Sequence, residues 1–213
     1  MAIKGLSKPI AGFYKNNGAG VVNYEDPFVA DHLVEYSFEA NVSEDNDLYA
    51  DNRVQESAAG KFADGSLTVK TADLMPELSM MILKAKEVER KVGEKTYTEI
   101  VFDDEQNSPY LGYGVVEEHE NDGITTYLPI WFPKVKFNIP AGAATTRGTE
   151  IEWQTREITA KVMRSDQNDE NYRHPWQISP KNPFTTEEEA VEYLFEVLGK
   201  KQQSDTEGQE EIV

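Results

Sequence analysis

Apolar and polar residues alternate with a period of two along several stretches of the chain, as in β-strands that bury one face. The clearest such stretch is Leu33–Val42, where apolar residues take the even positions and polar residues the odd ones. The polar set consists of Glu35, Ser37, Glu39 and Asn41, and the apolar set of Val34, Tyr36, Phe38, Ala40 and Val42. We expect a strand whose even positions pack against the core.

Two longer runs, within Gly123–Met163, flank a centre rich in glycine and small residues at 140–148. In the first run apolar side chains fall on odd positions, and Pro129 and Pro133 predict an edge strand or a bulge because proline cannot donate to a ladder. In the second run the apolar positions change from odd to even near Arg156, which predicts a β-bulge there. The two runs are expected to be long antiparallel strands.

Shorter segments complete the expected set of elements. Residues 65–69, 96–102 and 110–118 read as strands, 86–95 as a turn, and 118–123 as a hairpin turn ending in Asp-Gly. Apolar spacing of 3.6 residues predicts a helix at about 73–86. A second helix at about 186–198 is predicted from a capping box at its start and from Gly199 after its end.

These elements define a mainly β fold with minor α+β character, an antiparallel sandwich or barrel with a flanking mid-chain helix and a short C-terminal helix. Residues 1–31 are rich in glycine and polar residues and are expected to form an arm with little regular structure. Residues 32–200 form the β domain, and the acidic residues 201–213 are expected to be disordered.

A long polar segment, Ser43–Ser57, follows the clearest strand. Its aspartates have a spacing that suggests calcium, but Ala50 stands where an EF-hand loop needs glycine. A hairpin loop that contacts another subunit is the preferred interpretation. The residues assigned to this contact are Glu44, Asp45, Asp47, Tyr49, Asp51 and Arg53.

Composition excludes several classes of function. The formal net charge is −18, which gives no basic surface for holding nucleic acid by its phosphates. The chain has no cysteine and three widely separated histidines, and it shows no nucleophile, phosphate-loop or zinc motif. We therefore expect a structural protein with no catalytic residues, no metal and no cofactor.

Four stretches resemble the major tail tube proteins of long-tailed, siphovirus-type bacteriophages of Gram-positive hosts. They are A-I-K-G-L at the start, V-E-Y-S-F-E-A-N-V-S-E-D-N-D-L-Y-A-D-N, G-S-L-T-V-K-T-A-D-L, and S-P-Y-L-G-Y-G followed by W-F-P-K-V-K-F. The likeness covers about residues 1–165. It implies a β domain of the tail-tube type, hexameric rings that stack into a tube, and a virion tail assembled in the bacterial cytoplasm. It also implies tape measure, terminator and distal tail proteins as partners.

In such a tube the polar face of Leu33–Val42 is expected to line an acidic lumen through which DNA passes without specific binding. Acidic side chains repel phosphates, so the charge of the chain agrees with a conduit. The expected lumen residues are Glu35, Ser37, Glu39, Asn41, Ser66, Thr68 and Lys70. Two alternatives stay open: the tube of a related secretion or injection machine, and a non-enzymatic β-sandwich that binds a surface. Of the three tryptophans only Trp176 falls off the apolar strand faces, which argues against the surface-binding class.

Overall fold

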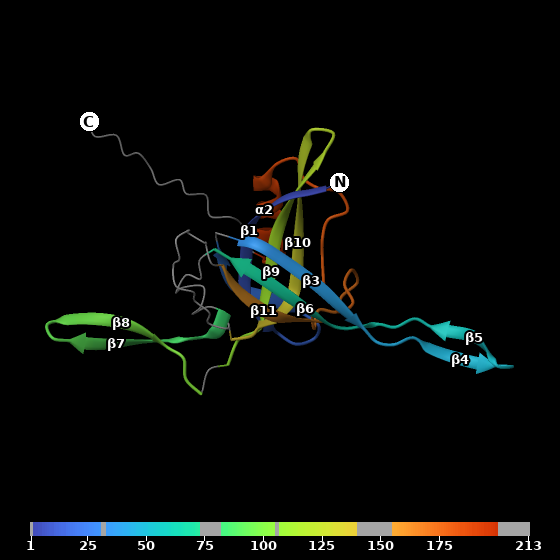
Figure 1. Ribbon diagram of the computed structural model, residues 1–213, viewed down its shortest axis with the longest axis horizontal. Coiled ribbons are helices and arrows are strands. Elements are labelled where there is room, and N and C mark those ends of the chain that lie inside the picture. The colour runs from blue at the N-terminus through green and yellow to red at the C-terminus, as the bar shows by residue number, and fades with distance from the viewer. Residues whose placement is uncertain (1, 31–32, 73–81, 105–106, 140–154, 200–213) are drawn as a thin grey trace, which may run out of the picture.

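The computed structural model describes residues 2–30, 33–72, 82–104, 107–139 and 155–199, which form one seven-stranded sheet, two hairpins and a helix (Figure 1). The order in the sheet is β2-β1-β9-β10-β11-β6-β3, and neighbouring strands pair antiparallel throughout the described part of the sheet. Its strands are β1 (Ala2–Asn16), β2 (Val22–Val29), β3 (Leu33–Val42), β6 (Phe62–Thr71), β9 (Leu111–Asn121), β10 (Ile124–Phe137) and β11 (Arg156–Met163). The predicted mainly β, antiparallel class is confirmed.

Outside this sheet, the hairpins and the helix complete the described elements. One hairpin joins β4 (Asn46–Ala50) and β5 (Arg53–Ala58), the other joins β7 (Lys86–Val92) and β8 (Lys95–Val101), and the helix is α2 (Glu187–Val197). Both hairpins project away from the sheet, in opposite directions (Figure 1). Neither hairpin hydrogen-bonds to the seven-stranded sheet as part of its ladder.

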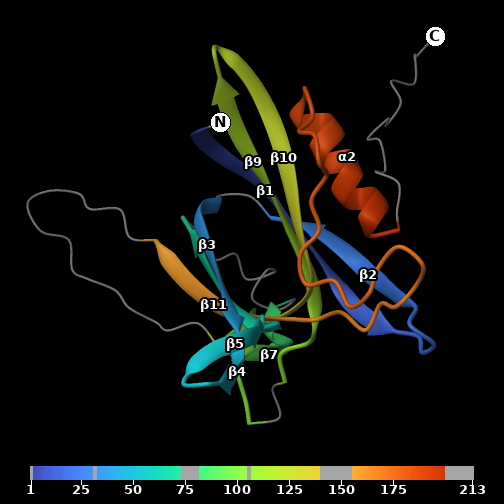
Figure 2. The ribbon, with the colours of Figure 1, turned by 90° about the vertical axis from the view of Figure 1, so that its right-hand side faces the viewer.

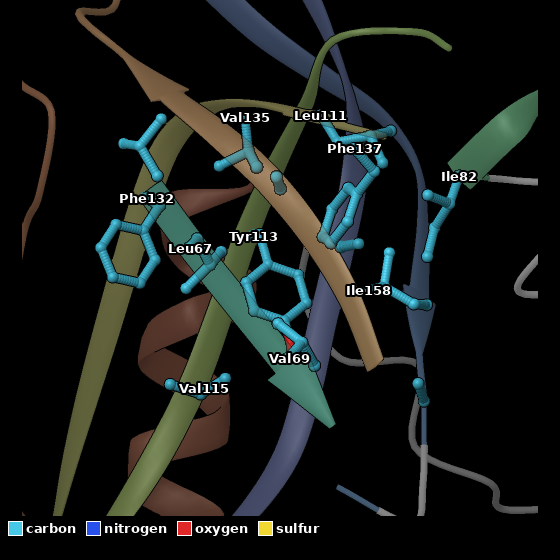
Figure 3. Close-up of a cluster of buried hydrophobic side chains, with 14 of the residues drawn as sticks. Leu67, Val69, Ile82, Leu111, Tyr113, Val115, Phe132, Val135, Phe137 and Ile158 are labelled. Atoms are coloured by element: carbon cyan, nitrogen blue, oxygen red, sulfur yellow. The ribbon is translucent and has the colours of Figure 1, made fainter. Parts of the chain in front are cut away.

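One hydrophobic core lies within the curve of the sheet, because its two halves face each other (Figure 3). The first half contributes Tyr113 and Val115 of β9, and the second contributes Leu67 and Val69 of β6. The remaining buried members are Ala11, Ala30, Ile82, Leu83, Leu111, Ile130, Phe132, Val135, Phe137, Ile158, Ala160 and Val162. A single bent sheet therefore encloses this core, whereas in a sandwich two separate sheets would enclose it.

A second core lies on the other face of β1, β9 and β10, where α2 covers the sheet (Figure 2). Trp131 is fully buried there against Leu194 and Ala190 of α2. Gly112 leaves the space that Trp131 occupies, since a Cβ on Gly112 would lie 2.2 Å from the indole. The helix begins as predicted: the Thr186 side chain accepts a hydrogen bond from the Glu189 N–H, and Gly199 follows with φ of +74°.

The expectation that residues 1–31 form an arm with little regular structure is wrong. Residues 2–16 form β1, which lies between β2 and β9 inside the sheet, and Ile10 is fully buried. The register of β1 shifts between Ser7 and Ile10 and again between Ala11 and Phe13. These irregularities break the two-residue alternation, so the segment reads as unstructured although it forms strands.

Most of the segment 86–95, where a turn was expected, belongs to the strand β7, and the turn is confined to Gly93 and Glu94. All residues of β7 are exposed, so no buried face imposes an alternation on the sequence. The hairpin expected within Ser43–Ser57 is confirmed, and most of the segment is paired as β4 and β5. The strands expected at 65–69, 96–102 and 110–118 are confirmed as parts of β6, β8 and β9.

The prolines of β10 were expected to mark an edge strand or a bulge. The register between β10 and β9 shifts between Phe132 and Val135, so the bulge beside Pro133 is confirmed. As a whole β10 is not an edge strand, because it lies between β9 and β11, but it pairs with β11 only over Lys134–Phe137. At Pro129 the ladder is to β9 alone, and on the other side the neighbouring N–H groups of Tyr127 and Trp131 donate to the carbonyls of Phe184 and Ile178.

Two predictions fall largely outside the described residues. The turn at 140–148 and the first half of the second run lie there, and so do residues 73–81 of the expected mid-chain helix. That helix cannot extend to residue 86 as expected, because Lys86 begins β7. The described part of the second run, β11, buries Ile158, Ala160 and Val162 as its even positions predict.

Candidate functional site

The candidate site is the outer surface of β3, β6, β11 and the end of β10, which we call the polar face. The strands align their polar positions: Glu35 pairs with Lys70, which in turn pairs with Glu157. The polar face consists of Glu35, Ser37, Glu39, Asn41, Asp64, Ser66, Thr68, Lys70, Lys134, Lys136, Asn138, Glu157, Thr159 and Lys161. All seven residues expected to share one surface are brought together there.

Alternation explains why this surface is polar on every strand. Leu67, Val69 and Ile158 on the opposite side are buried in the core, so their neighbours in sequence must point to solvent. The expected burial of the apolar side of β3 is only partly confirmed. Tyr36 and Phe38 are half-buried, but Val34 is 50% exposed and Val42 is 60% exposed. As the last strand of the sheet, β3 has a neighbour on one side only.

Ion pairs run across the polar face. Lys70 Nζ lies 2.8 Å from Glu35 Oε2, and Lys161 Nζ lies 2.5 Å from Asp64 Oδ2. The hydrogen bond to Glu35 raises the pKa of Lys70, and the hydrogen bond from Lys161 lowers the pKa of Asp64. Because all four side chains are in contact with solvent, these pairs order the surface more than they stabilise the fold.

The polar face carries lysines as well as carboxylates, so it is less acidic than the strand Leu33–Val42 alone suggests, and its place in an acidic lumen stays a prediction. Four carboxylates and four lysines lie on it, and one of these lysines, Lys134, pairs with a further carboxylate, Asp166, at 2.7 Å. The carboxylates belong to Glu35, Glu39, Asp64 and Glu157, and the ammonium groups to Lys70, Lys134, Lys136 and Lys161. The strand read in isolation showed only carboxylates, because its cationic neighbours come from strands distant in sequence.

The β4–β5 hairpin carries the residues expected to contact another subunit. Its tip is a tight turn with both central residues left-handed, Asp51 at φ of +52° and Asn52 at +60°. Leu48 and Tyr49 are 58% and 67% exposed. The Asp45 carboxylate accepts a hydrogen bond of 2.6 Å from the Gly60 N–H at the base of the hairpin. Among the described residues no cluster of acidic or histidine side chains could hold a metal.

A buried polar cluster that no sequence pattern predicts joins β3 to β9. The Tyr36 hydroxyl donates to Glu117 Oε1, and His119 Nε2 lies 2.9 Å from Glu117 Oε2. Glu117 and His119 are 7% and 9% exposed. Burial, with the Glu117 carboxylate as the next cause, raises the pKa of Tyr36. The cluster holds an edge strand against the opposite half of the sheet.

Trp176 does not offer the free aromatic surface expected of it. Its ring stacks on Phe62 with centroids 4.5 Å apart and on Phe38 with centroids 5.7 Å apart. Trp131 is in the second core, as its strand position predicts, and Trp153 lies outside the described residues.

No family model matches the sequence, and no curated protein matches it. Of the helices in the described ranges, none is long and apolar enough to cross a membrane.

Proposed function

We propose that this protein is the major subunit of a tail tube of the siphovirus type, which forms six-membered rings that stack into a conduit for DNA. The observation that carries the proposal is the polar face, which ends at β3, the last strand of its sheet. A broad polar surface bounded by a bare strand edge can be continued by the same surface of a neighbouring copy.

Edge exposure supports assembly. An edge strand has unpaired backbone groups, and soluble monomers usually protect such edges with charges, bulges or covering loops. On β3 the charges of Glu35 and Glu39 and two register shifts protect the edge in part, yet the side chains of Val34 and Val42 are at least half exposed. Pairing of β3 with a neighbouring copy would satisfy both the backbone groups and these apolar side chains.

Ring closure also suits the proposed conduit. Joined copies would make a wall on which lysines and carboxylates alternate, and its lysines are partly neutralised by ion pairs such as Lys70 with Glu35. DNA affinity grows with the number of cations that replace phosphate counterions. A balanced wall of this kind would neither hold DNA strongly nor repel it strongly. The tape measure, terminator and distal tail proteins would be its partners in the virion tail.

Assembly of the purified protein tests the proposal. We expect rings or tubes by electron microscopy and sedimentation at high concentration or with tail-assembly partners. Val34→Lys combined with Val42→Lys places charges on the β3 edge and should leave a folded monomer. Val34→Thr with Val42→Thr is the matched control, since threonine is uncharged and suits a strand, and it should still assemble. A wild-type chain that remains monomeric under all these conditions contradicts the proposal.

The tube of a secretion or injection machine is the second candidate, and the balanced polar face favours it, because a neutral wall also suits a protein cargo. Glu35→Lys with Glu39→Lys raises the charge of the face by four units per subunit. Tubes of this variant should retain DNA at low salt and release it as salt rises. The same substitutions would not change DNA retention if the polar face lay on the outside of an unrelated assembly that DNA never contacts.

A further inference from the structure

An open pocket of about 370 Å³ lies at the base of the β7–β8 hairpin. We call it the lysine pocket. It is lined by Lys84, Lys86, Asn107, Ser108, Pro109, Tyr110 and Lys136. The chain as a whole has 39 acidic and 21 basic side chains, yet none of the acidic residues in the described ranges lines this pocket. Three ammonium groups therefore converge on a cavity that opens to solvent.

The charges in the lysine pocket are incompletely neutralised. Lys86 Nζ lies 2.8 Å from Asp103 Oδ2. Lys136 Nζ donates to Asn107 Oδ1 at 3.1 Å and lies 5.6 Å from the ring centroid of Tyr110, and both of these partners are neutral. Within the described ranges, neither Lys84 nor Lys136 has a carboxylate at ion-pair distance. An anionic group entering the pocket would therefore gain two charge-assisted hydrogen bonds.

The backbone at Lys84 holds one of these charges in an uncommon conformation. Its φ is +53°, in the left-handed region where glycine is favoured and a lysine is strained. A glycine would satisfy this backbone without strain but would remove the ammonium group. A Lys84→Gly substitution therefore removes the ammonium group while the backbone keeps its left-handed conformation.

The β4–β5 hairpin matches the lysine pocket in charge. Residues 43–58 contain five carboxylates and one arginine, so their net charge is −4. The tip residue Asp51 and the neighbouring Asp47 and Tyr49 are exposed. Tyr110 at the pocket is 43% exposed, which offers an aromatic surface beside the lysines. Carboxylates on the hairpin could reach the ammonium groups while Tyr49 packs against that ring.

The β4–β5 hairpin and the β7–β8 hairpin, at whose base the lysine pocket lies, project from opposite sides of the sheet (Figure 1). A contact between the pocket of one copy and the β4–β5 hairpin of another therefore uses a different surface of each copy and joins the copies head to tail. Contacts of this heterologous type repeat without pairing off into dimers and produce rings or filaments.

We propose that the lysine pocket binds the carboxylates of the β4–β5 hairpin of a second copy. The inference rests on the proposed function, since it names the receptor for one of the contacts between subunits. The pocket's Lys84 and Lys136 provide the positive charge, and Asp47 and Asp51 of the other copy provide the negative charge.

Charge reversal on each side tests this contact. Lys84→Glu with Lys136→Glu makes the pocket acidic, and Asp47→Lys with Asp51→Lys makes the hairpin basic. Each pair of substitutions should raise the concentration needed for assembly about tenfold or more, because each sets like charges against each other. The quadruple variant restores opposite charges and should recover assembly at a concentration near that of the wild type. Circular dichroism checks that all variants are folded.

The matched control is Glu188→Lys with Glu192→Lys, two exposed positions of α2 that change the net charge as much as the hairpin variant does. It should assemble as the wild type does.

If the reversed variants assemble normally, or if the folded quadruple variant does not recover, the inference is wrong while the proposed function stands. If deletion of residues 201–213 blocks assembly as the pocket variant does and the quadruple variant fails, the acidic tail is the occupant instead. If the wild-type protein never assembles, the proposed function itself is wrong.

Discussion

Replacing Tyr36 by phenylalanine should destabilise the protein through loss of a single hydrogen bond. The Tyr36 hydroxyl donates to Glu117 Oε1, and the Glu117 side chain is 9% exposed, so water cannot readily replace the lost donor. His119 Nε2, 2.9 Å from the other carboxylate oxygen, remains in place. The substitution therefore leaves one buried carboxylate oxygen without its partner and changes little else.

The expected cost follows from the kind of bond. A hydrogen bond to a charged group contributes about 1.5–3 kcal/mol to stability. For a chain of this length each kcal/mol corresponds to a change in melting temperature of about 2–4 °C, so the melting temperature should fall by about 3–12 °C. The strand that is lost first should be β3, because Tyr36 anchors this edge strand to β9.

Tyr113 provides the matched control. It is also a buried tyrosine on the same core, but its hydroxyl has no hydrogen-bond partner among the described residues. Tyr113→Phe should therefore be neutral or stabilising, because it removes an unsatisfied polar group. Urea unfolding followed by circular dichroism measures both variants. Equal losses in the two variants, or no loss in Tyr36→Phe, would refute the reasoning.

Three further predictions concern packing, capping and pH. Gly112→Ala should cost about 1–3 kcal/mol in urea unfolding, because the new Cβ overlaps Trp131 inside a packed core; an unchanged midpoint would contradict it. Thr186→Ala should cost about 1 kcal/mol by removing the N-cap of α2, again measured in urea. The hydrogen bond from Lys134 lowers the pKa of Asp166, so stability is gained above the unfolded pKa near 4 and is lost as pH falls below it. Asp166→Asn should weaken that loss between about pH 4 and pH 2.

The lysine pocket shows why some sites escape sequence reasoning. Its lining comes from three separate parts of the chain, 84–86, 107–110 and β10, and its lysines come from the first and the last of these. No spacing along the chain links Lys84 to Lys136, and only the folded chain brings them to a common pocket. The cluster of Tyr36, Glu117 and His119 escapes for the same reason, because β3 and β9 are far apart in sequence.

The sequence by itself determined the fold class, the position and faces of β3, the bulge beside Pro133 and the limits of α2. These depend on period, capping groups and proline, which act between neighbours in the chain. Only the tertiary structure decided that residues 2–16 form an inner strand, since bulges hide their period. It also decided the charge of the polar face, because strand pairing adds the lysines of β6, β11 and β10 to the surface that carries the carboxylates of β3. Charge on a sheet is a property of several strands together, and no single strand of the sequence contains it.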